Sequence, residues 1–353
     1  MISTCEATAN IAVVKYWGKR DEKLILPTNS SLSFTMDDQL KTRTTVMFSD
    51  KFKEDEFWLN GQKMDLSDKD TAERVVQLDL VREKAGIKEK AKISSINCFP
   101  TAAGMASSAA GFAALACAAS KAAGLELNGK ELSILARRGS GSACRSVMGG
   151  FVEWQAGTKS DGSDSYAVQH ASETHWPELR NIIAVVDAKK KKVSSRAGMK
   201  QTVATSPLYK ARMEYLPKLV EDMKKAVMAK DFVRFAELTM RESSDMHAVM
   251  LDTWPPITYL NDWSKEIMHG AIELNGATPI AGYTFDAGPN AHIYTTKQNV
   301  GAVKKMLSEI EGVNKVIECK VGAGPRYVDD HLIDEDGVII PHEFIEGKGI
   351  VVK

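Results

Sequence analysis

Small residues dominate the stretch between positions 102 and 124, and this feature restricts the fold more strongly than any other in the sequence. From Ser108 the chain is rich in alanine as far as Ala123, and Gly124 then provides a typical helix end. Residues 108–123 therefore predict a helix. Because its side chains are short along the whole length, we expect this helix to pack very closely against a neighbouring element.

The glycine-containing start of this stretch, residues 104–111, favours anion binding. Small residues let a backbone approach a ligand closely, and the N–H groups at a helix start point toward negative charge. The segment lacks the Gly-Lys-Ser/Thr ending of the P-loop of nucleoside triphosphatases, so a phosphate here would be held without that lysine. A small-residue helix packed on a sheet explains the composition equally well, and the residues alone leave both interpretations open.

The charge balance argues against two classes of partner. Lys plus Arg equals Asp plus Glu at 46 each, whereas proteins that bind nucleic acid or a membrane surface usually carry a basic excess. We therefore predict neither nucleic acid nor a membrane as a partner. The 353 residues suffice for one large or two ordinary domains with a substantial core.

The cysteines and the lack of targeting signals predict a cytoplasmic protein. The five cysteines are widely spaced and contain no CxxC pair, which is typical of reduced thiols. No charged and then apolar leader opens the chain, and no apolar run has the length needed to cross a bilayer.

Hydrophobic patterning predicts an α+β chain in two halves. We place the boundary between an N-terminal domain at 1–187 and a C-terminal domain at 188–353. Asn60 and Gly61 predict a tight turn between two strands. Strands are expected at residues 42–48, 56–63, 92–98, 149–154, 181–188, 280–284, 291–295 and 315–321. Helices are expected at residues 71–85, 108–123, 130–138, 208–243 with a break near Pro217, and 300–310, with a further helix starting in 139–146.

A glycine–serine turn at residues 139–146 offers two hydroxyls and one cation. Ser140 and Ser142 can donate hydrogen bonds, and the Arg145 guanidinium suits bidentate contact with a carboxylate or a phosphate. The alternative is a glycine-rich turn between helices that carries a surface arginine.

Three further segments contain candidate polar groups. Asp286 stands at the end of an apolar strand, where partial desolvation would help a carboxylate act as a base, although an aspartate closing an Asx-turn is the alternative. Residues 15–20 place three cations beside two aromatic rings, which suits either an anion site or a solvated turn. Ser195 and Arg196 follow a lysine run at 189–192 and form a second candidate anion site. No cluster has the residue spacing of a protein metal site.

Taken in order, these segments resemble the diphosphomevalonate decarboxylases, within the superfamily of galactokinase, homoserine kinase, mevalonate kinase and phosphomevalonate kinase. The resemblance extends over residues 7–326, and its motifs are long and specific. The matching segments are residues 10–12, 15–21, 26–33, 100–111, 138–146, 194–199, 251–257, 283–291 and 322–325. One departure is Thr8, because the family often has proline there, but Asn10 in the same motif is intact.

The resemblance implies a two-domain fold. The N-terminal half would be like ribosomal protein S5 domain 2, and the C-terminal half would be ferredoxin-like. It implies that ATP and Mg²⁺ bind near residues 100–111, with the metal held largely by ATP. It also implies that a diphosphorylated 3-hydroxy-3-methyl acid is converted to isopentenyl diphosphate, CO₂, ADP and phosphate. Family members are commonly homodimers, so we expect a homodimer.

The resemblance also implies roles for individual residues. Asp286 matches the catalytic aspartate and would orient or deprotonate the substrate hydroxyl, while Lys15 would pair with Asp286 and with the transferred phosphoryl group. Arg145 would hold the substrate carboxylate. The positions that match substrate contacts are Tyr16, Lys19, Ser140, Ser142, Ser195 and Arg196. The positions at the nucleotide phosphates are Ala103, Gly104, Met105, Ala106, Ser107 and Ser108.

Three alternatives remain at this point. A close relative could take the monophosphate, although Tyr16, Lys19 and Arg196 favour the diphosphate. A small-molecule kinase of the same superfamily would stop after phosphorylation, without releasing CO₂. A nucleic-acid-binding module shares the N-terminal fold, but the zero net charge speaks against it.

Overall fold

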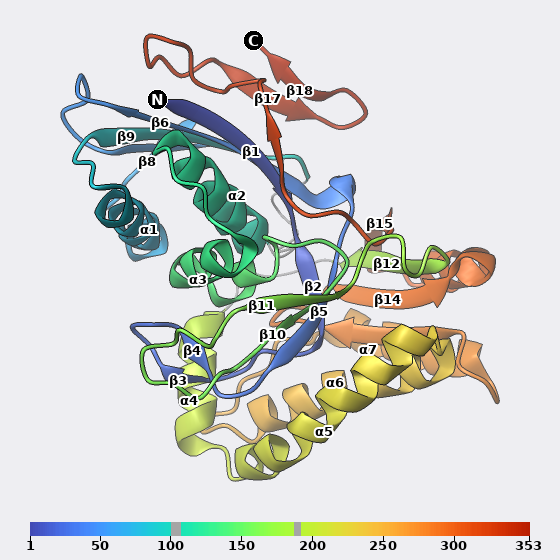
Figure 1. Cartoon of the computed structure of the whole chain (residues 1–353). Coiled ribbons are helices and arrows are strands. Elements are labelled where there is room, and N and C mark those ends of the chain that lie inside the picture. Colours follow the sequence, from blue (N-terminus) through green and yellow to red (C-terminus); the bar gives the residue numbers. More distant parts are fainter. Residues whose placement is uncertain (100–106, 187–191) are drawn as a thin grey trace.

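The computed structural model describes residues 1–99, 107–186 and 192–353, and over these ranges helices and sheets are mixed as predicted. Figure 1 shows a large sheet covered by helices at one end of the molecule and a pair of long helices at the other. Two four-stranded sheets lie between these ends. The α+β class predicted from the sequence is therefore confirmed.

The large sheet carries the alanine-rich helix on one face. Its strands run in the order β16 (Arg326–Val328), β1 (Ile2–Thr8), β6 (Lys41–Ser49), β9 (Lys90–Asn97), β7 (Glu56–Leu59) and β8 (Gln62–Met64). Helix α2 (Ser107–Ala122) packs along β1 and β6, beside α1 (Lys69–Ala85) and α3 (Gly129–Gly139). Buried Ala113, Ala114 and Ala116 allow the α2 backbone to approach the sheet closely, which confirms the predicted packing.

The two smaller sheets are made by different parts of the chain. One has the order β11 (Ala167–Ala171), β10 (Phe151–Trp154), β5 (Ser31–Thr35) and β2 (Asn10–Val14). The other has the order β13 (Ala281–Phe285), β14 (Ala291–Thr296), β12 (Leu179–Val186) and β15 (Val313–Cys319). Helices α7 (Asp262–Asn275) and α8 (Val300–Ser308) pack their apolar residues against one face of the second of these sheets.

Two long helices join the cores of these two sheets. Apolar residues of α5 (Leu208–Ala229), such as Leu216 and Met223, share a core with Ile11 of β2 and Tyr294 of β14. Helix α6 (Phe232–Leu251) contributes Phe235 to the same core. Helix α6 contacts both β2 and β13, the edge strands whose ends carry two of the predicted site residues.

Two predictions about helices are wrong. Helix α5 runs through Pro217, and the break comes instead at Lys230, whose φ of 55° is left-handed, and at Asp231, which caps α6. Burial of the apolar face of α5 outweighs the one backbone hydrogen bond that a proline removes. Residues 139–146 start no further α-helix but form a single 3-10 turn, Gly141–Cys144, because Gly141 packs directly against the rings of Tyr16 and Trp154.

The hairpin prediction is confirmed by backbone geometry. Asn60 and Gly61 connect β7 to β8 with φ values of 50° and 78°. Such left-handed values at both turn positions match the twist of the flanking strands, and Asn followed by Gly adopts them readily.

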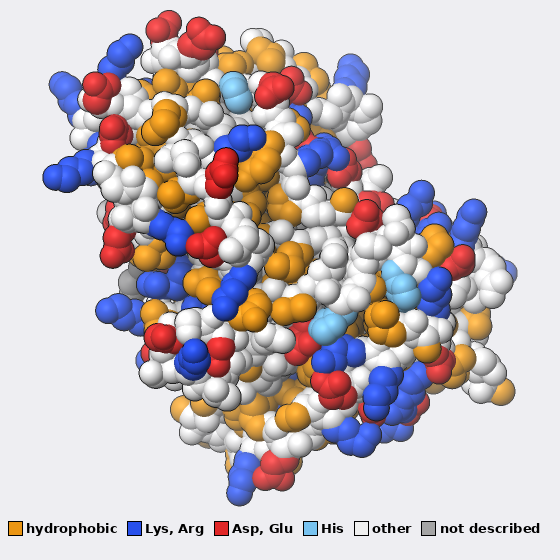
Figure 2. Space-filling model, viewed as in Figure 1, with side chains coloured by type: hydrophobic (Ala, Val, Ile, Leu, Met, Phe, Trp, Pro, Cys, Tyr) orange, Lys and Arg blue, Asp and Glu red, His pale blue; other side chains and the backbone are white. Residues whose placement is uncertain are grey.

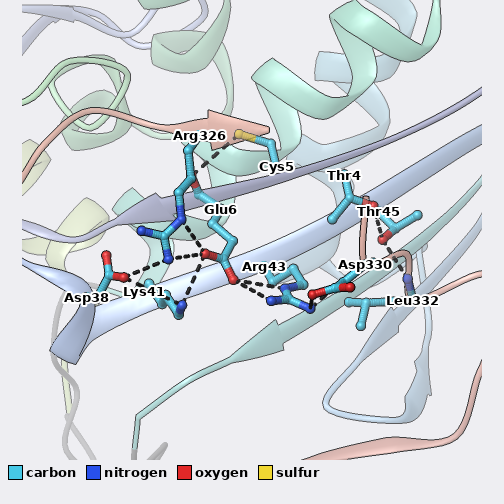
Figure 3. Close-up of polar contacts among 10 residues, drawn as sticks. All are labelled: Thr4, Cys5, Glu6, Asp38, Lys41, Arg43, Thr45, Arg326, Asp330 and Leu332. Carbon is cyan, nitrogen blue, oxygen red and sulfur yellow. Dashed lines mark hydrogen bonds and ion pairs between the residues drawn. The ribbon is translucent and has the colours of Figure 1, made fainter. Parts of the chain in front are cut away.

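Ion pairs tie the C-terminal part of the chain to the first strand. Figure 3 shows Glu6 on β1 accepting hydrogen bonds from Lys41, Arg43 and Arg326, at 3.1, 2.9 and 2.8 Å. Burial raises the pKa of Glu6, but the hydrogen bonds from Arg43 and Lys41 outweigh burial, so its pKa is lowered. The carboxylate at the centre of this cluster thus links β1 to its two neighbouring strands, β6 and β16.

The proposed division after residue 187 stays a prediction. Strands that precede residue 187 pair with strands that follow it: β12 pairs with β14 and β15, and β1 pairs with β16. The chain ends in a separate hairpin of β17 (His342–Ile345) and β18 (Gly349–Val352), which contacts β9.

The surface and the remaining elements add two observations. In the described ranges, no helix combines the length and the apolar character needed to cross a membrane. On the face shown in Figure 2, Lys and Arg side chains are interspersed with Asp and Glu.

The other elements are β3 (Lys19–Asp21), β4 (Leu26–Pro27), α4 (Ser195–Thr205) and the 3-10 turns Asp38–Leu40 and Lys297–Asn299.

Candidate active site

One cavity of about 520 Å³ brings the predicted site residues together. It is formed where the ends of β2 and β13, the turn after α3 and the start of α4 converge. Its walls include every predicted catalytic and substrate-contacting residue, together with Ser108. These are Lys15, Tyr16, Lys19, Ser108, Ser140, Ser142, Arg145, Ser195, Arg196 and Asp286.

An ion pair between Lys15 and Asp286 lies in this cavity. Lys15 follows β2 and Asp286 follows β13, and the Lys15 Nζ donates to Asp286 Oδ1 over 2.6 Å. The Lys15 side chain is 2% exposed, whereas that of Asp286 is 48% exposed and faces the cavity. The ammonium is therefore held in place by protein, and the carboxylate is open to a ligand.

Arg145 is buried at the same cavity, so the interpretation as a surface arginine is wrong. Its Nε donates to Asn10 Oδ1 over 3.1 Å, and its Nη1 donates to Ser31 Oγ over 2.6 Å. Asn10 is itself held, because its Nδ2 donates to the Ser142 carbonyl and to Ser146 Oγ. Burial lowers the pKa of Arg145, while the charge of Asp286 opposes that effect. The guanidinium is thus a fixed and desolvated cation.

Tyr16 contributes a buried hydroxyl to the cavity wall. Its ring packs edge-on against Trp154 with centroids 4.7 Å apart. Among the described residues, none forms a hydrogen bond with the Tyr16 hydroxyl. Burial raises the pKa of Tyr16, so the group remains a neutral hydrogen-bond donor. A Cβ at Gly141 would lie 2.8 Å from the Tyr16 ring, so only glycine fits at this position of the turn.

The two cations expected to hold a distal phosphate each pair with a glutamate. Lys19 Nζ donates to Glu22 Oε2 over 2.5 Å. Arg196, in the first turn of α4, forms an ion pair with Glu73 of α1 and donates to the Gly139 carbonyl over 3.3 Å. Arg20, the third cation of its segment, instead donates to the carbonyls of Ala156 and Lys159 and does not line the cavity.

Helix starts supply further donors. Ser140 lies between α3 and the 3-10 segment, Ser142 lies within that segment, and Ser195 begins α4 behind the cap Ser194. Ser108, in the first turn of α2, is exposed toward the cavity. The N-terminus of a helix attracts anions, and Ser108 brings the first turn of α2 to the cavity.

Part of the predicted phosphate loop falls in the gap between residues 99 and 107 of the described ranges. Ala103, Gly104, Met105 and Ala106 lie outside the described residues, and Ser107 is the first residue of α2. Their assigned contacts with the nucleotide phosphates therefore stay predictions.

Comparisons with known proteins agree along almost the whole chain. Residues 7–167 match the model of the diphosphomevalonate decarboxylase-like N-terminal domain, and residues 181–314 match that of the mevalonate 5-diphosphate decarboxylase C-terminal domain. The chain belongs to the diphosphomevalonate decarboxylase family. It is 46% identical to the diphosphomevalonate decarboxylase of Candida albicans, over 92% of this chain and 98% of the relative. It is 43% identical to that of Homo sapiens, over 96% and 97%.

Solved structures of mevalonate diphosphate decarboxylases share the fold. The enzyme from Staphylococcus aureus aligns with a TM-score of 0.86 and 40% identity, covering 93% of this chain and 99% of that one. The enzyme from Trypanosoma brucei aligns with a TM-score of 0.87 and 35% identity, covering 95% and 100%. The family resemblance and the two-domain fold predicted from the sequence are therefore confirmed.

Sequence reasoning misses two cavity residues on α1, Glu73 and Arg74. Arg74 lies over the rings of Phe57 and Phe112, at 4.3 and 4.9 Å, and Glu73 pairs with Arg196. Two adjacent charges on a helix normally indicate its solvent side, so no local signal identifies them. Only the packing of α1 beside α2 and α3 brings them to the cavity.

Proposed function

We propose that this chain is an ATP-dependent decarboxylase that converts 5-diphosphomevalonate to isopentenyl diphosphate, CO₂, ADP and phosphate. The observation that carries the proposal is the position of the Lys15–Asp286 pair and the buried Arg145 on one cavity. Membership of the family supports it. A structure described as MDDEF in complex with MVAPP, AMPPCP and magnesium, 40% identical over 93% of this chain, supports it further.

The first step is phosphorylation of the tertiary 3-hydroxyl. Asp286 accepts the hydroxyl proton while the oxygen attacks the γ-phosphorus of ATP. The bond from that phosphorus to the bridging oxygen breaks, and ADP leaves with the electron pair. The Lys15 ammonium, 2.6 Å from Asp286, neutralises charge on the phosphoryl group in transit. Such transfer depends on positioning and charge neutralisation more than on covalent catalysis.

The second step is loss of CO₂ and phosphate. The C1–C2 bond breaks, and its electron pair forms the C2=C3 double bond. The C3–O bond breaks at the same time, and its pair leaves with the phosphate. Arg145 binds the C1 carboxylate in one orientation, because Asn10 and Ser31 already fix the guanidinium plane. Phosphorylation in the first step is needed because a tertiary hydroxyl is a poor leaving group.

The diphosphate of the substrate lies toward Lys19 and Arg196, the two further cations that line the cavity. Lys19 and Arg196 neutralise it, and the unpaired hydroxyl of Tyr16 donates to it. Ser140, Ser142 and Ser195 add hydroxyl and backbone donors at helix and turn ends. A ligand with two phosphates can displace Glu22 and Glu73 from the two cations.

ATP and Mg²⁺ fit the remaining groups. Residues 103–108 and the start of α2 would hold the ATP phosphates, and Ser108 and Asp286 are two of the oxygen-bearing side chains that line the cavity. Among the described residues there is no cluster of three or more His, Cys, Asp or Glu side chains suited to a metal. Mg²⁺ would therefore be bound chiefly by ATP, where it lowers the charge repulsion that opposes phosphoryl transfer.

The test is to incubate the protein with ATP, Mg²⁺ and either 5-diphosphomevalonate or 5-phosphomevalonate, and to measure ADP and CO₂ together. We expect one CO₂ for each ADP, with the diphosphate strongly preferred. ADP without CO₂ would instead indicate a kinase, and preference for the monophosphate would indicate a phosphomevalonate decarboxylase.

Two other expectations remain predictions. Each of the five cysteines is buried and free of a disulfide, which agrees with a reducing compartment such as the cytoplasm. The homodimer is expected from the family resemblance, and sedimentation of the purified chain would test it.

A further inference from the structure

Two adjacent side chains of α6 bind the backbone at both members of the Lys15–Asp286 pair. Glu242 Oε1 accepts a hydrogen bond from the Lys15 backbone N–H over 3.0 Å. Ser243 Oγ accepts one from the backbone N–H of Phe285, the residue before Asp286, over 3.1 Å. Both side chains are buried. A single turn of one helix therefore contacts both strand ends from which the pair projects.

These contacts join two four-stranded sheets, which also meet at the isolated bridge between Met36 and Val321. β2 is the edge strand of one four-stranded sheet and β13 is the edge strand of the other. An edge strand has N–H groups without a ladder partner, and a buried N–H needs an acceptor. Glu242 and Ser243 provide these acceptors. The separation of the two edges thus follows the position of α6.

The Glu242 carboxylate is itself fixed from a third element. Arg212 of α5 donates from Nη2 to the same Glu242 Oε1 over 2.5 Å, and its Nη1 pairs with Asp245. The side chains of Arg212 and Glu242 are both fully buried. A buried carboxylate is stable only when it is paired, so Arg212 holds Glu242 in one position.

We propose that Glu242 and Ser243 are positioning residues that set the distance and direction between the Lys15 ammonium and the Asp286 carboxylate. This inference rests on the proposed function, because it gives these two groups their catalytic task. Neither Glu242 nor Ser243 lines the cavity, so each acts through the backbone of a residue that does. Displacement of a catalytic group by about 1 Å can cost on the order of 100-fold in rate.

The first experiment compares Ser243→Ala with Ser244→Ala. Ser244 is the next residue of α6 and is exposed, so the same change there leaves the Phe285 N–H bonded. For Ser243→Ala we expect kcat to fall by about 10- to 100-fold, while KM for ATP and for 5-diphosphomevalonate stays within about twofold. If Ser243 only stabilised the fold, Ser243→Ala would have a lower Tm, and kcat would not fall relative to the two KM values. Equal kcat values for the two variants would overturn the proposal for Ser243.

The second experiment compares Glu242→Gln with Asp245→Asn. Both changes remove one carboxylate from Arg212, but only Glu242 bonds the Lys15 backbone. If pairing with Arg212 were the whole role, both variants would lose stability and keep kcat. We expect Glu242→Gln alone to lower kcat, by about tenfold, because a neutral amide oxygen is a weaker acceptor for the Lys15 N–H.

Crystal structures of the wild type and of Ser243→Ala separate this inference from the proposed function. We expect Phe285 and Asp286 to shift in the variant, so that the 2.6 Å contact between Lys15 Nζ and Asp286 Oδ1 is lost or lengthened. An unchanged contact would refute the inference whatever the enzyme does. A wild type that does not turn over 5-diphosphomevalonate refutes the proposed function alone, since the geometric comparison needs no substrate.

Discussion

Lys15 and Asp286 are 271 positions apart in the chain, yet the Lys15 ammonium donates to the Asp286 carboxylate over 2.6 Å. One residue leaves the edge strand of the β2 sheet, and the other leaves the edge strand of the β13 sheet. Helix α6 contacts both strand ends, through Glu242 at the Lys15 N–H and Ser243 at the Phe285 N–H. The activity proposed for the cavity depends on this relationship.

Asp286→Asn should lower kcat by about three orders of magnitude or more with little change in either KM. The amide fills the same space beside Lys15 but cannot accept the hydroxyl proton. Release of ADP and CO₂ under saturating substrates gives the measurement. Asp262→Asn, at an exposed position on α7, is the matched control and should behave as the wild type. Near-normal turnover by Asp286→Asn would remove the assigned role.

Arg145→Lys should lower kcat/KM for the acid substrate by about 100-fold. The ammonium keeps the charge but cannot reproduce the bonds to both Asn10 and Ser31 while presenting two parallel N–H groups to a carboxylate. Steady-state kinetics with varied 5-diphosphomevalonate will measure the loss. Arg241→Lys, on the exposed side of α6, controls for the substitution itself. The same kcat/KM in both variants would contradict the carboxylate-binding role.

Arg196→Gln should raise KM for 5-diphosphomevalonate by about tenfold or more, with a smaller effect on kcat. Its side chain is half-exposed at the cavity, where it pairs with Glu73 and donates to the Gly139 carbonyl, so a phosphate can reach the guanidinium. Repeating the KM measurement with 5-phosphomevalonate, which lacks the second phosphate, tests which phosphate Arg196 binds. An equal rise for both substrates would show that Arg196 does not distinguish the second phosphate.

His247→Asn should make the protein less sensitive to acid. Burial lowers the pKa of His247 to about 4, whereas an unfolded histidine titrates near 6.5. Between these values the unfolded chain binds more protons, so stability falls as the pH falls through this window, by about 3 kcal/mol in all. Asparagine does not titrate in this range, so His247→Asn removes the contribution of residue 247 to the pH dependence of stability.

Urea unfolding at pH 7, 5.5 and 4.5 measures this effect as the change in the free energy of unfolding. His269→Asn is the control, because His269 is exposed on α7. His292 is also buried with its pKa lowered to about 4, so the single variant should lose only part of the acid dependence. A pH dependence of stability identical to that of the wild type would contradict the prediction.

Local features were predictable from the sequence because their causes are local. The alanine run gives the buried helix α2, and Asn60-Gly61 gives a turn whose two φ values are positive. Apolar, β-branched segments give β12, β13 and β14 within a residue or two of the expected bounds. The family motifs also identified Lys15, Arg145 and Asp286 as a set, and the cavity brings all three together.

The remaining features depended on contacts between distant segments. Pro217 reads as a helix break, but the core around α5 keeps the helix intact, since apolar burial outweighs one lost hydrogen bond. Glu73 and Arg74 look like a solvated pair until α1 is packed beside the cavity. Glu242 looks like an ordinary helix glutamate, yet it is buried against Arg212 and the Lys15 backbone.

Local sequence specifies which chemical groups this protein has and the order of its local elements, because propensity, turn geometry and motif spacing act over a few residues. Tertiary structure decided which of these groups meet and in what environment. Burial made Arg145 a fixed cation rather than a surface one, and α6 brought two edge strands close enough for Lys15 to reach Asp286. These outcomes depend on desolvation and on the summed packing of distant segments, which no short stretch of sequence encodes.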